Sequence, residues 1–215
     1  TDYQRTVAVR NVLSGIANGK TFVDAIILYD RNHRIYDSGG LGGITDVSEP
    51  YFEQFKKAAY GIAWKETGPS NYERESGGAK VVSLFQRFNS QMSGGLLGVL
   101  QLSIKERSIS DQYANVQLGK TGKLFIVNSD GVIISHPDSR LIDSSIKDEP
   151  YYEMVHERQK GDTLVMDGQD YLVISRPYPR MDWTIVGVVP IKEITEDKSA
   201  LTTRFALIGG AFILL

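Results

Sequence analysis

The chain has 215 residues, of which 41% are hydrophobic and 23% charged, with a net charge of -2 and no cysteine. This length and composition are typical of a globular protein with one or two domains and a substantial core. The small net charge gives no support for binding to nucleic acid or to anionic lipid. The lack of cysteine excludes thiol catalysis, thiolate metal sites and a disulfide scaffold, and it leaves the cellular compartment open.

The first half of the chain is predicted to fold as a helix, two strands, a second helix and three strands. Apolar residues at near-helical spacing predict an amphipathic helix over residues 1–17, which Asn18-Gly19 ends. A central helix opens at Ser48-Glu49-Pro50, where the fixed φ of proline suits the first turn. The predicted strands are 23–29, 35–37, 62–65, 80–88 and 96–104, and the central helix runs over 48–59.

The second half repeats this order. Its clearest unit is a hairpin in which Ser129-Asp130-Gly131 joins two β-branched runs, because glycine supplies the positive φ that the turn needs. Asp167-Gly168 is a second turn of this kind. The predicted helices are 108–118 and 149–158, and the predicted strands are 123–128, 132–135, 163–166, 169–177 and 183–189.

Short sequence matches link the two halves. The matched pairs are Asp30 with Asp130, Glu49-Pro50-Tyr51-Phe52 with Glu149-Pro150-Tyr151-Tyr152, Phe85-Gln86-Arg87 with Ile174-Ser175-Arg176, Gly98-Val99 with Gly187-Val188, and Ile104-Lys105-Glu106 with Ile191-Lys192-Glu193. Two repeats of this size indicate two similar domains rather than a solenoid. The alternating strands suit an antiparallel sheet with helices on one side. Each half is therefore predicted to be a PAS-like sensor module with a small ligand cavity.

Two segments make the resemblance specific. GKTGKLFIVNSDGVIISHPD (119–138) and YLVISRPYPRMDWTIVGVVPIKEI (171–194) resemble the double Cache family of extracytoplasmic sensor domains, and the resemblance covers about residues 1–204. The family occurs on sensor histidine kinases, chemoreceptors and cyclic-di-GMP enzymes, and this chain looks most like the histidine kinase members.

The resemblance implies an α+β fold with four parts. These are an N-terminal signalling helix (1–22), a membrane-distal module (23–107), a membrane-proximal module (108–194), and a linker helix that enters the membrane (195–215). It also implies a homodimer formed through the N-terminal helix. The rival interpretation, from another class, is an interaction module that recognises a partner such as a solute-binding protein.

The run 205–215 (FALIGGAFILL) carries no charge. Eleven helical residues extend over about 16 Å, roughly half of a bilayer core. We expect the first half of a transmembrane helix, which places the protein in a cell membrane with this domain outside the cytoplasm. The alternative is a buried terminal helix, although Gly209 and Gly210 are better tolerated in a membrane helix than in a soluble one.

Few features of the sequence support a catalytic or metal-binding site. His33, His136 and His156 lie far apart and have no zinc-ligand spacing. No serine lies in a G-x-S-x-G motif, and no clustered acid–base pair is evident. The sequence therefore predicts a domain that is not an enzyme and that has no metal and no cofactor.

Two loops resemble known motifs without satisfying them. Gly119-Lys120-Thr121 resembles a phosphate loop, but Ala114 stands where the first glycine is needed and a strand follows instead of a helix. The segment 128–131 resembles the start of a calcium loop, but Ser139 occupies the position of the required glutamate.

Binding of a small molecule is the function that these exclusions leave. In the distal module an aromatic wall and one cation would suit a small anionic or polar ligand. The candidates there are Trp64, Arg87, Tyr29, Tyr51, Phe85 and Ser83. The less favoured proximal candidates are His136, Tyr151 and Arg176. The alternative roles are core packing for the aromatic residues and a surface ion pair for the arginines. Family members that bind amino acids carry Arg-x-Trp-Tyr at the central helix, whereas this chain has Glu49-Pro50-Tyr51-Phe52, so the ligand stays open.

Overall fold

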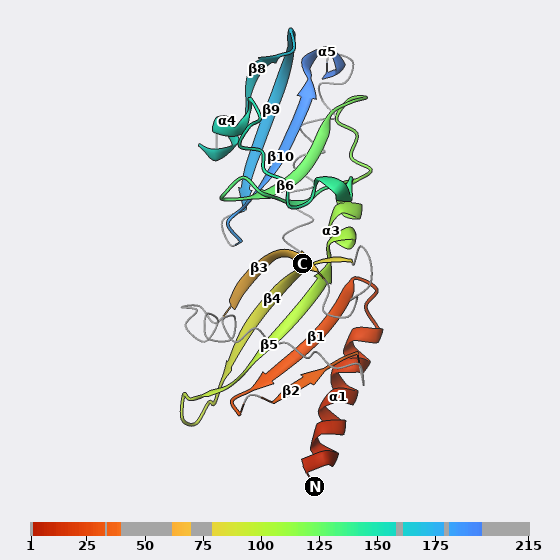
Figure 1. The fold of residues 1–215 in the computed structure, drawn as a ribbon, viewed down its shortest axis with the longest axis vertical. Coiled ribbons are helices and arrows are strands. Elements are labelled where there is room, and N and C mark those ends of the chain that lie inside the picture. Colours follow the sequence, from red (N-terminus) through yellow and green to blue (C-terminus); the bar gives the residue numbers. More distant parts are fainter. Residues whose placement is uncertain are drawn as a thin grey trace. The chain divides into compact units, whose positions relative to one another are not determined.

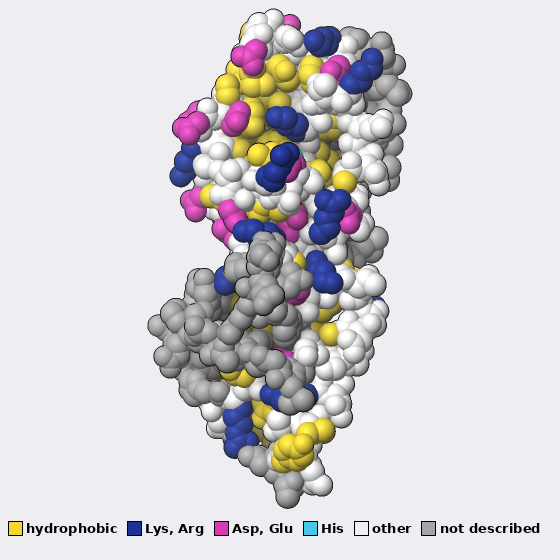
Figure 2. All heavy atoms as spheres, turned by 45° about the vertical axis from the view of Figure 1, so that its right-hand side comes forward, with side chains coloured by type: hydrophobic (Ala, Val, Ile, Leu, Met, Phe, Trp, Pro, Cys, Tyr) yellow, Lys and Arg dark blue, Asp and Glu magenta, His cyan; other side chains and the backbone are white. Residues whose placement is uncertain are grey.

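The computed structural model describes residues 2–32, 34–39, 62–69, 79–157, 161–178 and 181–194. The chain divides into two compact units, Thr1–Ser108 and Ile109–Leu215, and each unit contains one five-stranded sheet (Figure 1). On the face drawn in Figure 2, basic and acidic side chains of the described residues are interspersed, in keeping with the small net charge.

The first unit contains a long helix, α1 (Asp2–Asn18), and an antiparallel sheet. The sheet order is β2-β1-β5-β4-β3. Its strands are β1 (Val23–Asp30), β2 (Ile35–Asp37), β3 (Ile62–Pro69), β4 (Lys80–Asn89) and β5 (Leu96–Lys105).

Helix α1 packs on one face of this sheet, alongside β1 and β2 (Figure 1). Leu13 forms a buried cluster with Val23 and Ile26, and Val9 and Ala17 pack at its edge. Positions 9, 13 and 17 are four residues apart, so they lie on one side of the helix. Because neighbouring residues of a strand point to opposite faces, Ile27 belongs to the other face, which we call the inner face.

The second unit is built on another antiparallel sheet, of order β7-β6-β10-β9-β8. Helix α3 (Glu106–Tyr113) leads into it from the first unit. The remaining elements are β6 (Lys123–Asn128), β7 (Ile133–Ser135), the 3-10 helix η1 (Ser139–Leu141), α4 (Tyr152–His156), β8 (Asp162–Met166), β9 (Gln169–Tyr178), β10 (Trp183–Pro190) and α5 (Ile191–Ile194).

One apolar core holds the second unit together. Phe125, Val127 and Val186 from the sheet meet Tyr151 and Val155 from the α4 region in a single buried cluster. The corresponding face of the second sheet is therefore a mainly apolar core, which also includes the buried Ser175 and Thr184.

The two sheets have the same strand order, so the predicted α+β fold with an N-terminal helix and two antiparallel five-stranded sheets is confirmed. Most predicted strands lie within two residues of the observed ones. Strand β3 is longer than expected, because residues 66–69 continue the pairing with β4 past a bulge. Helices α3 and α4 are shorter than predicted, with eight and five residues.

Equivalent turns fix the correspondence between the units. The Oδ1 of Asp30 accepts hydrogen bonds from the amides of Asn32 (2.7 Å) and Arg34 (2.9 Å). The Oδ1 of Asn128 accepts from the amides of Asp130 (3.0 Å) and Val132 (2.8 Å) in the same pattern. Asp30 therefore corresponds to Asn128, and the sequence match of Asp30 with Asp130 is wrong by two residues.

Two predictions lie outside the described residues: the central helix over 48–59 and the membrane helix that begins near 205. Within the part of the chain that the structure describes, no helix has both the length and the apolar character needed to cross a bilayer.

Candidate functional site

The inner face of the first sheet carries a buried polar cluster made of Tyr29, Ser83, Gln101 and Ser103, which we call the inner-face polar cluster. The Tyr29 hydroxyl donates to Oε1 of Gln101 at 2.7 Å. Nε2 of Gln101 donates to the hydroxyls of Ser103 (3.0 Å) and Ser83 (3.3 Å). The two serine hydroxyls are themselves 3.0 Å apart. The cluster is uncharged and is linked by hydrogen bonds throughout.

Strand register places other candidates on the same face. Phe85 pairs with Gln101, and Arg87 pairs with Val99, which in turn pairs with Tyr29. Phe85 is buried, and the Arg87 side chain is half-buried. Lys65 pairs with Ser83, so a second half-buried cation lies on this face. The structure thus brings together Tyr29, Ser83, Phe85 and Arg87 of the predicted distal site.

Two predicted distal residues do not join them. Trp64 pairs with Leu84, one position out of step with Phe85, so its side chain belongs to the opposite face, where α1 packs. Tyr51 lies outside the described residues.

Gln101 and Ser103 were not predicted from the sequence. The sequence pattern does distinguish them, because they are polar residues two positions apart in the apolar strand LLGVLQLSIK. In an alternating strand this spacing puts both side chains on one face.

The second unit has valine wherever the first has a member of the inner-face polar cluster. Pairing of Asp30 with Gly98 and of Asn128 with Trp183 aligns the two sheets strand by strand. Counted along the paired strands, Tyr29, Ser83, Gln101 and Ser103 correspond to Val127, Val173, Val186 and Val188. All four valines belong to the apolar core of the second unit, and none is more than 6% exposed.

The proximal candidates fall into different environments. Tyr151 is buried with its ring 6.4 Å from that of Phe125, and burial raises the pKa of its hydroxyl. The His136 ring is half-buried, 5.8 Å from Phe125, and Nδ1 accepts a hydrogen bond from the Asp138 amide at 2.8 Å. Arg176 is exposed and pairs with Ile185, next to Val186 of the core face, so it points to the other face. His136 and Tyr151 meet around Phe125, and Arg176 does not join them.

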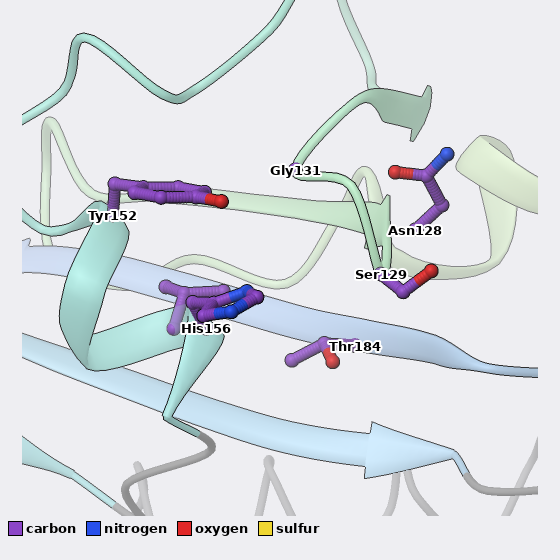
Figure 3. Close-up of a pocket in the computed structure, with 7 residues that line it drawn as sticks. Asn128, Ser129, Gly131, Tyr152, His156 and Thr184 are labelled. Carbon is purple, nitrogen blue, oxygen red and sulfur yellow. The ribbon is translucent and has the colours of Figure 1, made fainter.

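A small cavity of about 70 Å³ lies elsewhere in the second unit, between the β6–β7 turn and α4 (Figure 3). The rings of Tyr152 and His156 stack there with centroids 5.5 Å apart. Gly131 approaches Tyr152 so closely that a Cβ at this position would lie 2.8 Å from the ring. The side chain of Asn128 points away from the stacked pair in Figure 3, and its Oδ1 already accepts two backbone amides. None of the predicted proximal candidates lines this cavity.

The two loops that resemble known motifs make contacts within the second unit. Among the residues that the structure describes, no group of three or more histidine, aspartate or glutamate side chains could hold a metal ion. The turn at 119–121 is followed by strand β6, as the sequence predicted, and its backbone amides contact Glu193.

Two PAS-like sheets with equivalent topology, one of them carrying a buried polar face, define a two-module sensor-type domain. The family model for the Cache domain, in its double Cache form (dCache_1), matches residues 2–197. The chain belongs to this family, as the resemblance predicted. Double Cache domains are extracytoplasmic ligand-binding parts of membrane sensor receptors.

Solved structures with the same fold share little sequence identity with this chain. The ligand-binding domain of Mlp24 with asparagine superposes with a TM-score of 0.63 at 19% identity, covering 97% of this chain and 80% of that one. An extracellular domain assigned to the histidine kinase mmHK1S-Z2 gives 0.62 at 16% identity, covering 88% and 83%. The domain of the Pseudomonas fluorescens chemoreceptor CtaA with L-isoleucine gives 0.58 at 16% identity, covering 90% and 86%. Similar structures thus include both chemoreceptors and histidine kinases.

Proposed function

We propose that this chain is the extracytoplasmic ligand-sensing domain of a bacterial transmembrane signalling receptor, whose output is a histidine kinase or a chemotaxis signalling domain. The ligand is a small polar molecule that binds over the inner face of the first sheet, in the membrane-distal module. The membrane anchor is the segment 205–215. The domain itself performs no catalysis.

The contrast between the inner-face polar cluster and its four valine counterparts supports this proposal most directly. Burial of a polar group costs free energy unless a hydrogen bond compensates, whereas burial of valine is favourable. In the second unit, four valines occupy these places in the apolar core. We infer that the polar residues at the same four places in the first unit serve ligand recognition rather than folding.

The charges on this face favour a ligand with an anionic group. Lys65 pairs with Ser83 of the uncharged cluster, Arg87 lies four residues from Ser83 on the same strand, and both cations are half-buried. Guanidinium and ammonium groups bind carboxylates through charge-assisted hydrogen bonds, which are stronger than neutral ones. The relatives determined with asparagine and L-isoleucine hold ligands with a carboxylate. We infer that a small carboxylate or amino acid binds here, even though the amino-acid motif of the central helix is absent.

A thermal-shift screen of the chain against carboxylates, amino acids, neutral sugars and amines tests this assignment. A ligand at 100 times its Kd should stabilise the folded chain by about 2.7 kcal/mol. We expect one or more carboxylates to stabilise the chain. Arg87→Gln should weaken this stabilisation. Arg176→Gln should leave it unchanged, because Arg176 is exposed in the second unit.

The inner-face polar cluster is tested by exchanging its residues for their counterparts. Tyr29 and Gln101 form one hydrogen bond with each other. The double variant Tyr29→Val/Gln101→Val removes both groups, so neither is left buried without the other. The double variant should keep the fold and lose the stabilisation by ligand. The control Thr163→Val, at an exposed strand position, should keep the full stabilisation by ligand. Stabilisation by no compound, or full binding by the double variant, would contradict the proposed site.

We also propose that the receptor is a homodimer that associates through α1. This helix exposes Val12 (61%) and Ile16 (53%), which are four residues apart and so lie next to each other on one side of the helix. Sedimentation of Val12→Glu/Ile16→Glu should show a loss of dimer relative to wild type, and wild-type chain that sediments as a monomer at high concentration would contradict association through α1.

A further inference from the structure

Glu193 on α5 is held by three hydrogen bonds from a turn more than 70 residues earlier in the chain. Its carboxylate accepts from the amides of Lys120 (2.6 Å) and Thr121 (2.8 Å) and from the Thr121 hydroxyl (2.9 Å). These donors belong to the segment that resembled a phosphate loop. The turn binds an anion after all, but the anion is a side chain of the same unit.

The turn is shaped for this contact. Gly119 has a φ of +71°, and a Cβ at this position would lie 2.6 Å from Oε2 of Glu193 and 2.7 Å from its Cβ. A side chain at Gly122 would collide with the Leu118 carbonyl. Any other residue at Gly119 would both strain the backbone and displace the carboxylate. The hydrogen bonds from Thr121 lower the pKa of Glu193, so the carboxylate is charged at neutral pH.

The contact joins two segments of the second unit that are far apart in the sequence. The turn lies between α3, through which the chain enters this unit, and β6. Glu193 lies on α5, which directly follows β10 and precedes the segment that runs toward 205–215. The hydrogen bonds therefore join the turn that follows α3 to α5, the last described helix of the chain.

We propose that the Glu193 carboxylate and the turn 119–122 form a latch that sets the resting state of the receptor. With the latch closed, α5 is held against the turn. Release of the three hydrogen bonds frees α5, and ligand-induced signalling alters the balance between the two states. A ligand can alter that balance only through different affinities for them. This role rests on the proposed sensor function, whereas the contact itself does not.

Two variants and a matched control test the latch. Glu193→Gln keeps the side-chain size and removes the charge, and Thr121→Val removes one donor. Glu153→Gln is the control, because Glu153 is another exposed glutamate of the same unit, on α4. In the wild-type chain the amide NMR shifts of Lys120 and Thr121 should titrate together with a midpoint below 4.5, the ordinary value for the carboxyl group. In Glu193→Gln this titration should vanish, and exchange of the two amides should accelerate.

The readout of function is the resting output of the full-length receptor without ligand. We expect Glu193→Gln and Thr121→Val to change it in the same direction, with Glu193→Gln shifting it by about fivefold or more, and Glu153→Gln to leave it at the wild-type level. A contact that is only structural would abolish the titration in Glu193→Gln while resting output and ligand response stayed as in wild type, and this result would overturn the latch.

Absence of the amide titration in the wild-type chain would overturn it as well. The two proposals fail separately: if no compound stabilises the chain but Glu193→Gln still shifts the resting output, the ligand assignment is wrong and the latch stands.

Discussion

At the scale of single residues, His136 gives the second unit a pH-dependent stability. Its pKa is lowered from 6.5, mainly because burial disfavours the charged ring, with a smaller contribution from Lys123, while Asp138 opposes the shift. Nδ1 accepts the Asp138 amide, which a protonated ring could not do. Between the lowered pKa of the folded chain and 6.5, the unfolded chain binds more protons than the folded chain. The free energy of unfolding therefore falls as the pH drops below about 6.5, and it levels off below the pKa of the folded chain.

We expect urea unfolding between pH 7.5 and 5.5 to reveal this decline in wild type and a smaller decline in His136→Gln. His156→Gln is the matched control, because that ring is exposed, and its profile should follow wild type. Equal slopes for wild type and His136→Gln would mean that folding does not lower the pKa of His136.

Gly131 is required for two separate reasons, which a pair of variants can distinguish. Its φ is +76°, and a Cβ would lie 2.8 Å from the Tyr152 ring. Gly168 has a similar φ of +72° with nothing within 4 Å of a Cβ, so Gly168→Ala reports strain alone. Strain of this kind costs about 1 kcal/mol, and we expect roughly 2–4 kcal/mol for Gly131→Ala because the ring must also move.

Denaturant unfolding of the two alanine variants measures the difference. Equal losses would show that Tyr152 moves aside without cost. In that case the stacked pair of Tyr152 and His156 would be a loose surface feature rather than a fixed wall of the cavity.

Strand alternation decides which candidate residues the sequence can place. Ser83, Phe85 and Arg87 were correctly placed on one face, because every second residue of a single strand shares a face. Trp64 could not be placed, since its side depends on how β3 aligns with β4, and that register comes from tertiary pairing. The aromatic ring of Tyr29 marks it as a candidate, whereas Gln101 and Ser103 are marked only by being polar residues on one face of an otherwise apolar strand.

At the scale of elements, strand lengths were predicted well and register poorly. The sequence match of Arg87 with Arg176 is off by one residue, because Arg87 pairs with Val99 and corresponds to Pro177, whose partner is Thr184. A shift of one residue moves a side chain to the other face of the sheet. This explains why Arg176 is exposed while Arg87 lies on the inner face.

Helix α1 depends on one apolar contact more than on its own helix propensity. Leu13 is 7% exposed and packs with Val23 and Ile26. Leu13→Ala should cost about 2–4 kcal/mol in the free energy of unfolding of the first unit, the usual range for a buried leucine. The adjacent Val12 is 61% exposed in the single chain, so Val12→Ala should change the stability of the monomer, measured at low concentration, by less than about 0.5 kcal/mol.

Chemical denaturation followed by circular dichroism measures both variants. A loss for Leu13→Ala no larger than that for Val12→Ala would mean that α1 is held by contacts other than this cluster, such as the hydrogen bond from Ser14 to the Ser38 carbonyl at 2.6 Å.

At the scale of the whole molecule, each unit has its own buried clusters, so each should unfold as a separate cooperative transition. Calorimetry of the chain should then resolve two transitions. Leu13→Ala should lower only the first unit's transition, and Val186→Ala, at a site with 0% exposure, should lower only the second.

A ligand of the inner face stabilises the unit that binds it. At 100 times its Kd it should raise the first unit's transition by roughly 10 °C, since about 2.7 kcal/mol acts on a unit of near 100 residues. If the second transition rises as well, the free energy of ligand binding reaches the unit that carries Glu193, as a signalling domain requires. A rise of the second transition alone would place the ligand in the second unit and not on the inner face of the first sheet.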